Sequence, residues 1–270
     1  MATVHTDRLA ELNEPEGNVT LTDIVMDERV REKSSPYKPL FSNVQPYIFS
    51  KPTFLALLDV FEVFHTRNSM ADDYTASERR VIEQLLATVD LTPVMRRARA
   101  EASKYRSMSD DEWREHMWQI WFQRHSIGRT SRCGFEHVFI GERTEDLNGR
   151  ELVGGLHNWV KFYLEEQRGA AKYLGPRYKK TGRLEAALNP YFISGSFTWD
   201  LNGKHLVKDV GGFFVGVSPE WQLAIATVAY FETECADRAT ARHWSRDFVS
   251  RDVGYVRSAR LGEQVCLDLS

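Results

Sequence analysis

The chain has 270 residues, which is enough to bury a substantial core in one large domain or two small ones. Hydrophobic residues make up 42% and charged residues 27%, as is ordinary for a soluble globular protein. A formal net charge of −3 excludes a protein that holds nucleic acid by bulk positive charge, so any such contact has to be local.

The cysteine count and the hydropathy of the chain indicate where in the cell the protein is expected. Cys133, Cys235 and Cys266 lack the spacing of a zinc site, and an odd, sparse count is typical of free thiols in a reducing environment. The N-terminal sequence has no apolar signal-peptide core, and no run of about 18 apolar residues is present. We therefore expect an intracellular, cytoplasmic protein that does not bind membranes.

Helical patterns follow a polar, turn-rich stretch of about 50 residues. Apolar residues at three-residue steps predict a helix within residues 51–65. Thr75 with Glu78, and Ser109 with Glu112, have the spacing of capping boxes and predict that two further helices begin there. The second of these has an apolar face made of Trp113, Met117, Ile120 and Trp121.

The pattern changes after about residue 127. "GFEHVFIGE" (134–142) and "GGFFVGVS" (211–218) are typical of short strands, and residues 156–169 between them predict a helix ended by Gly169. Ser218 and Pro219 predict the start of another helix. Helices followed by mixed strands and helices indicate an α+β fold. We expect one unit, 1–270, in which a mainly helical part, 1–126, packs on a catalytic α+β part, 127–270.

Two of the eight histidines have a context typical of a site. His137 in "CGFEH" and His157 in "GGLH" lie close to glycines, which allow sharp turns and close backbone approach. Two imidazoles suit acid–base chemistry, because one can take a proton while the other gives one. We expect His116 and His125, by contrast, to face solvent or to cap their helix.

A cation would complete such a site by stabilising negative charge in the transition state. Lys204 follows Gly203 in a polar turn and is the candidate, and Lys208 is close enough to compete for the role. The alternative for either residue is an ordinary solvated lysine.

A divalent metal site is a further alternative. Glu136, His137, Glu142 and His157 supply ligand types that such an ion accepts. Adjacent residues of a regular strand point to opposite faces, however, so Glu136 and His137 could not easily hold the same ion.

Four blocks in one order carry a resemblance to a known family: "GFEHVFIGE", "GLHNWVKFYLEE", "SFTWDLNGK" and "FFVGVSPEWQLAIATVAYF". With these blocks, and with "KPLFSNVQPYIFSKPTFLALLDVFE" and "DEWREHMWQIWF" before them, the chain resembles the EndoU (XendoU-like) endoribonucleases over nearly its whole length. The resemblance implies an α+β fold whose C-terminal part has two small antiparallel sheets with helices. It also implies cleavage of single-stranded RNA at uridines, leaving 2′,3′-cyclic phosphate and 5′-hydroxyl ends, and dependence on Mn²⁺ or Ca²⁺. We expect a monomer.

The same resemblance assigns residues. It implies that His157 is the base for the ribose 2′-hydroxyl, that His137 is the acid for the leaving 5′-oxygen, and that Lys204 stabilises the transition state. Glu136 and Glu142 fall on acids that support activity in the family. Because the 2′-hydroxyl is the nucleophile, DNA is not expected to be cut.

One segment departs from the family pattern. Base recognition falls on "GYVRSARLG", where Ser258 is present but Arg260 stands in place of a tyrosine, with Tyr255 nearby. Arginine can also stack on a base. Because of this departure, the resemblance supports the cleavage reaction more strongly than it supports a preference for uridine. Two other functions remain open: a catalytically weak RNA-binding protein of the same fold, and a metal-dependent hydrolase using Glu136, Glu142 and a histidine.

Overall fold

A computed structural model describes residues 23–26, 39–66, 73–127, 130–146, 148–176 and 192–235. By its internal contacts the chain divides into two compact units, each assembled from separate stretches of sequence. Their described residues are 49–135 and 218–235 in one, here the helical unit, and 23–48 and 136–217, with the gaps given above, in the other, the sheet unit. The α+β class is confirmed, but a single boundary near residue 127 differs from this division, because the last helix joins the N-terminal helices.

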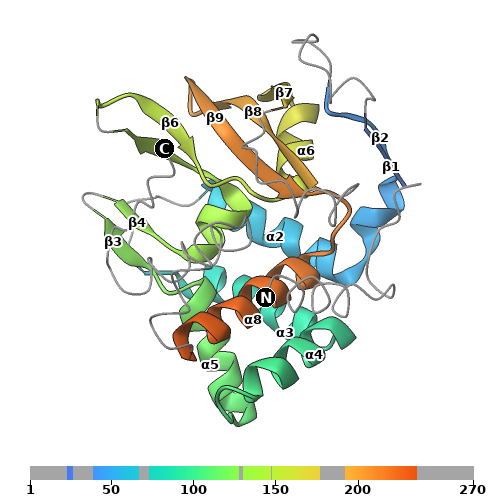
Figure 1. Ribbon diagram of the computed structural model, residues 1–270, viewed down its shortest axis with the longest axis vertical. Helices are drawn as coiled ribbons and strands as arrows, with labels where there is room; N and C mark the ends of the chain where they lie inside the picture. The colour runs from blue at the N-terminus through green and yellow to red at the C-terminus, as the bar shows by residue number, and fades with distance from the viewer. Residues whose placement is uncertain are drawn as a thin grey trace, which may run out of the picture. The chain divides into compact units, whose positions relative to one another are not determined.

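Five helices and a short hairpin make up the described part of the helical unit (Figure 1). The helices are α2 (Pro52–Thr66), α3 (Ala76–Asp90), α4 (Pro93–Ser103), α5 (Asp110–Trp121) and α8 (Pro219–Cys235), and the hairpin strands are β3 (His125–Ile127) and β4 (Thr130–Arg132). Helix α8 contacts α2, α3 and α4, so a segment distant in sequence helps to form the core of this unit.

The predicted helix starts are confirmed. The hydroxyls of Thr75 and Ser109 each accept the backbone N–H three residues on, and Glu78 and Glu112 bond back to the cap residues, so both capping boxes are complete. The four residues of the predicted apolar face of α5 are all buried. His116 differs from its prediction. It is buried, its Nδ1 lies 2.7 Å from the Glu112 carbonyl oxygen, and its ring stacks on Phe231.

The sheet unit is built on one five-stranded sheet in the order β5-β6-β9-β8-β7. Its strands are β5 (Glu142–Glu145), β6 (Glu151–Gly154), β7 (Ala171–Pro176), β8 (Phe192–Leu201) and β9 (Lys204–Phe214). The unit also contains α6 (Trp159–Gln167) and the strand pair β1 (Ile24–Met26) and β2 (Phe41–Val44), which leads into the 3-10 turn η2 (Pro46–Ser50). The sheet is mixed rather than purely antiparallel, because β6 runs parallel to β9.

Strands β8 and β9 form the long hairpin that dominates this sheet (Figure 1). Asn202 and Gly203 connect them, both with positive φ (51° and 77°), as a tight hairpin turn requires. A register shift between Gly195 and Phe197 marks a bulge, beyond which β9 carries the pair Gly211–Gly212.

The stretch "GFEHVFIGE" is not a strand, contrary to the prediction. Residues Glu136–Ile140 form a π-helix, η3, and strand β5 begins only at Glu142. Short apolar runs do not distinguish a strand from a buried helical turn by periodicity alone. Single π-turns are rare and frequently lie at functional sites, so η3 is a candidate segment of the site.

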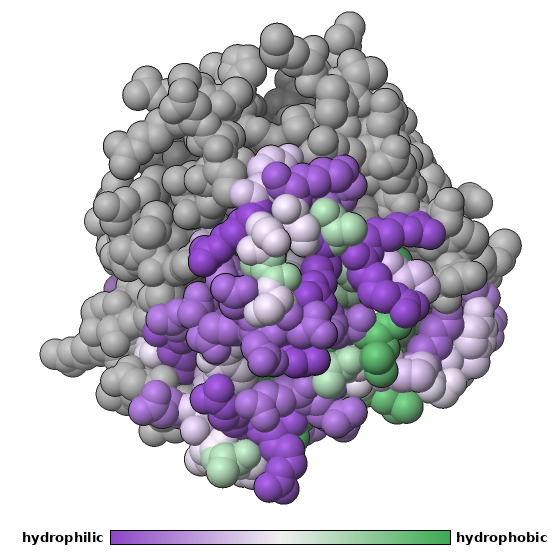
Figure 2. All heavy atoms as spheres, turned by 90° about the horizontal axis from the view of Figure 1, so that it is seen from below, coloured by the Kyte–Doolittle hydropathy of each residue, from purple (hydrophilic) through white to green (hydrophobic). Residues whose placement is uncertain are grey.

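Helix α6 is held to β2 by a carboxylate. Glu166 accepts hydrogen bonds from the backbone N–H groups of Leu40 (2.6 Å) and Phe41 (3.0 Å), while the Phe41 ring packs on Trp159 and Tyr163. On the face drawn in Figure 2, the described side chains are mostly hydrophilic and the hydrophobic ones form small separate groups. Within the described ranges, no helix has both the length and the apolar character needed to cross a membrane.

Candidate active site

Two backbone segments of the sheet unit bring His137 and His157 together. His137 lies in η3, and His157 lies in the loop between β6 and α6. The N–H of Leu156 donates to the carbonyl oxygen of His137 (2.9 Å), and the N–H of His157 donates to that of Val138 (2.8 Å). The centroids of the two imidazole rings lie 5.6 Å apart. The structure therefore groups both predicted histidines in one site.

His137 is paired with a carboxylate. Its Nδ1 lies 3.0 Å from Oε1 of Glu142, and both side chains are largely buried. Gly154, opposite Glu142 in the β5–β6 pairing, leaves room for this carboxylate, because a Cβ there would lie 2.9 Å from the Glu142 Cγ. Because a carboxylate only accepts hydrogen bonds, Nδ1 carries a proton, and a proton held at Nε2 is one that His137 can give away.

His157 has a neutral partner instead. Its Nδ1 lies 2.7 Å from the carbonyl oxygen of Gly212 on β9. Because a carbonyl oxygen only accepts, Nδ1 carries the proton, and in the neutral ring the lone pair is on Nε2. Its buried ring and this single tautomer suit it to act as a base. The two histidines thus differ in the charge of their partners, which suits them to different chemical tasks.

Gly155 allows the two histidine segments to approach. Its φ is +60°, and a Cβ added to it would lie only 1.9 Å from the carbonyl oxygen of His137. Any other residue at this position would push the loop away from η3. The sequence signal was the double glycine in "GGLH", and the structure gives each of its two glycines a separate neighbour in the site.

Lys204 is not brought to the histidines. It lies at the turn end of β9, and its Nζ donates to both carboxylate oxygens of Glu151 (2.6 and 2.8 Å). These hydrogen bonds lower the pKa of Glu151 below its ordinary value. Gly212, the partner of His157, is eight residues further along the strand, a path of about 25 Å. That distance is too great for a lysine side chain to cover.

Lys208 lies at the histidine site instead. Its Nζ donates to the carbonyl oxygen of Gly155 (2.7 Å), two residues before His157. Gly211 leaves space for this side chain, since a Cβ there would meet the Lys208 Cε at 2.7 Å. Lys208 lies on the same strand as Gly212, the partner of His157. Lys204, by contrast, directly follows the Asn202–Gly203 turn at the other end of the strand.

The other predicted residues are placed as follows. Glu136 is the first residue of η3, half-buried, and its carbonyl oxygen accepts from Gly141 N–H (2.9 Å). Tyr255, Ser258 and Arg260 lie outside the described residues. Among the described residues, no group of three or more His, Cys, Asp or Glu side chains is arranged to hold a metal ion. In the structure, Glu136, Glu142 and the two histidines are therefore not arranged as a metal site.

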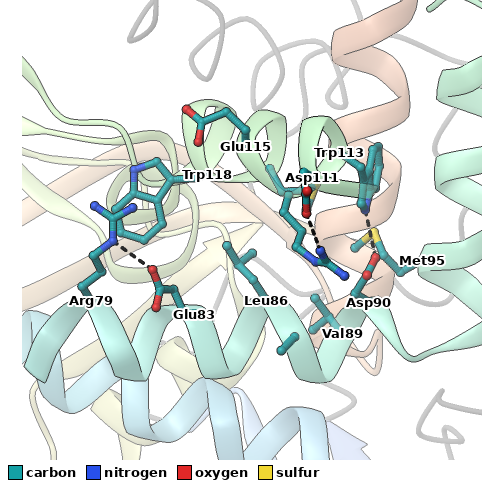
Figure 3. Close-up of a pocket in the computed structure, with 13 residues that line it drawn as sticks. Arg79, Glu83, Leu86, Val89, Asp90, Met95, Asp111, Trp113, Glu115 and Trp118 are labelled. Atoms are coloured by element: carbon teal, nitrogen blue, oxygen red, sulfur yellow. Dashed lines mark hydrogen bonds and ion pairs between the residues drawn. The ribbon is translucent and has the colours of Figure 1, made fainter. Parts of the chain in front are cut away.

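A cavity of about 380 Å³ lies in the helical unit between α3 and α5 (Figure 3). Its polar side chains bond to one another: Arg79 to Glu83, Arg114 to Asp111, and the Trp113 N–H to Asp90. The Arg79 guanidinium also lies 4.2 Å from the centre of the Trp118 ring. With four acids, two arginines and no histidine, its lining is poorly suited to binding or cleaving RNA.

Comparison with known proteins gives matches to one family. The family model described as "Endoribonuclease XendoU" matches residues 6–245. The chain is 32% identical over 210 residues to poly(U)-specific endoribonuclease-B of Xenopus laevis, covering 75% of this chain and 68% of that protein. It is 30% identical over 197 residues to uridylate-specific endoribonuclease B of Danio rerio, covering 71% and 67%.

A solved structure agrees as well. It is described as "The structure of XendoU: a splicing independent snoRNA processing endoribonuclease" and matches with a TM-score of 0.68 at 25% identity, covering 85% of this chain and 83% of that one. The family match spans most of the sequence, and both histidines of the site fall within it. The chain therefore belongs to the XendoU family and is, by class, an endoribonuclease.

Proposed function

We propose that this endoribonuclease cleaves single-stranded RNA, preferentially at uridines, by attack of the ribose 2′-hydroxyl on the adjacent phosphorus. The products carry 2′,3′-cyclic phosphate and 5′-hydroxyl ends. The observation that carries the proposal is the pair of histidines, 5.6 Å apart, with partners of different charge. The names of the relatives, which print poly(U) and uridylate specificity, support the base preference.

One histidine takes and the other gives the proton that each step of the reaction moves. Nε2 of His157 takes the proton of the 2′-hydroxyl as the oxygen bonds to phosphorus. The bond from phosphorus to the 5′-oxygen then breaks, and Nε2 of His137 gives its proton to that oxygen. Water is not consumed in this step, and DNA, which lacks the nucleophile, is not cut.

Lys208 supplies the cation in this proposal, in place of Lys204. Its ammonium lies in the histidine loop, where it can bond to a non-bridging phosphate oxygen as charge builds up. Lys208→Ala should lower kcat by about 10²–10³-fold. Lys204→Ala is the matched control, because it also removes a lysine charge from β9. That lysine pairs with Glu151 at the surface, where an ion pair contributes little free energy, so kcat should stay within about threefold of wild type. A larger loss in Lys204→Ala than in Lys208→Ala would return the assignment to Lys204.

Dependence on Mn²⁺ or Ca²⁺ stays a prediction. If a metal acts on the RNA, or on a segment outside the described residues, EDTA should abolish cleavage. The free energy of unfolding should then be the same with and without EDTA. The chain is proposed to act as a monomer, which light scattering after gel filtration can check.

The decisive experiment is cleavage of a labelled single-stranded RNA with one uridine, comparing wild type with His157→Ala and His137→Ala. A cyclic phosphate formed by wild type and lost in both variants supports the mechanism. An RNA with a 2′-deoxy residue at the uridine should resist cleavage. RNA that is bound but left intact by wild type would instead favour the catalytically weak binding protein.

A further inference from the structure

Trp199 lies against the end of η3, the segment that holds His137. It is 2% exposed and sits on β8, between β7 and β9. A Cβ added to Gly141 would lie 3.0 Å from Cζ3 of Trp199 and 2.8 Å from the Cβ of Leu156. The indole therefore reaches the backbone at the end of η3, where that backbone also packs against the residue before His157.

The backbone atoms at this contact determine where the imidazoles lie. The N–H of Gly141 closes η3 by donating to the carbonyl oxygen of Glu136 (2.9 Å). Leu156, in a left-handed conformation (φ 61°), donates to the carbonyl oxygen of His137. A shift of the indole would therefore move η3 against the His157 loop and change the distance between the two rings.

A buried ion pair orients the indole. The Trp199 Nε1–H donates to Oε2 of Glu165 (3.2 Å), and Oε1 of Glu165 lies 2.6 Å from Nζ of Lys161. Burial raises the pKa of Glu165, but the charge and hydrogen bond of Lys161 and the indole N–H outweigh it, so the net shift is downward and the carboxylate stays charged. Both ion-pair residues are on α6, whose N-cap Asn158 directly follows His157.

We propose that Trp199, oriented by the Glu165–Lys161 pair, is a positioning residue that sets the spacing of His137 and His157 for cleavage. The inference rests on the proposed function, since it concerns the rate of that reaction. A misplacement of about 1 Å at a reacting group can cost about 100-fold in rate. An indole that only filled the core would affect stability and not the chemical step.

The test compares two buried tryptophans that each donate to a carboxylate. Trp199→Phe removes the outer ring and the N–H at the site. Trp113→Phe makes the same change in the helical unit, where the N–H donates to Asp90 (2.9 Å). Unfolding by urea, kcat, KM and the pH–rate profile are measured for both variants with the single-uridine RNA.

Trp199→Phe should lower kcat by about 10- to 100-fold, keep KM within about threefold, and move one limb of the pH–rate profile. Trp113→Phe should lose comparable stability and keep the wild-type kcat and profile. Glu165→Gln retains an oxygen for the indole N–H, so its kcat should fall by several-fold only. If Trp199→Phe does not fold, the drop in kcat and the moved profile in Glu165→Gln carry the same test.

Two results would overturn the inference, and they are distinguishable. Wild-type kcat and pH profile in a less stable Trp199→Phe would reduce the indole to core packing while leaving the proposed function intact. Absence of a cyclic phosphate from wild type would remove the proposed function, and the inference with it.

Discussion

Replacing Gly155 with alanine tests the backbone contact on which the site depends. A Cβ at this position would lie 1.9 Å from the His137 carbonyl oxygen, so the loop has to retreat by about 1 Å before the contact reaches even 3.0 Å. Left-handed strain costs about 1 kcal/mol, and the two hydrogen bonds from Leu156 and His157 to η3 contribute about 1 kcal/mol each. We expect a loss of about 3 kcal/mol in the free energy of unfolding and at least about 100-fold in kcat.

Gly149→Ala and Gly203→Ala are matched controls for this experiment. Both glycines have positive φ (+76° and +77°), but a Cβ on either meets nothing within 4 Å. They should lose only the strain energy, about 1 kcal/mol, and keep the wild-type kcat. Urea unfolding and single-turnover cleavage of the single-uridine RNA measure both quantities. A Gly155→Ala variant as stable and active as these controls would refute the role of the backbone contact.

Other predictions concern charge and capping. Glu142→Gln keeps a hydrogen-bond acceptor for His137 but removes the charge beside it, so kcat should fall by about 10-fold or more; an unchanged kcat would argue against a role for this pair in the reaction. Burial raises the pKa of Glu220. Hydrogen bonds from Thr53 and other groups offset only part of this rise. The folded state then favours the neutral carboxyl, and stability falls as the pH rises from about 4.3 through the folded pKa. Glu220→Gln should reduce this fall in urea unfolding between pH 4.5 and 7, and an unchanged fall would exclude Glu220 as its source. Ser109→Ala should cost about 1 kcal/mol by loss of its capping box, while leaving kcat unchanged.

The sequence predicted best the features that depend on neighbours along the chain. Capping boxes act over three residues, so the starts of α3 and α5 were predicted correctly, as was the end of α6 before Gly169 (φ +73°). Helix α4 was not predicted, although Thr92 and Pro93 form its N-cap and first turn. The glycine-rich context of His137 and His157 also identified both histidines, because close backbone approach leaves a signal in the sequence.

Tertiary structure decided the partners of these residues. A π-helix and a strand of five residues have similar local composition, so the sequence did not separate them; in the structure Glu136–Ile140 form a π-helix whose carbonyl groups bond to the loop after Gly155. The choice between Lys204 and Lys208 depended on where the β8–β9 turn falls, since four residues along a strand cover about 13 Å. His137 finds its partner, the Glu142 carboxylate, only five residues on, whereas the partner of His157 is the carbonyl oxygen of Gly212 on β9, 55 residues away, and no local pattern could pair those two. The sequence thus determined which two histidines lie in the site, and the pairing of strands determined the partner of His157 and the lysine that lies beside it, because those contacts join segments that are distant along the chain.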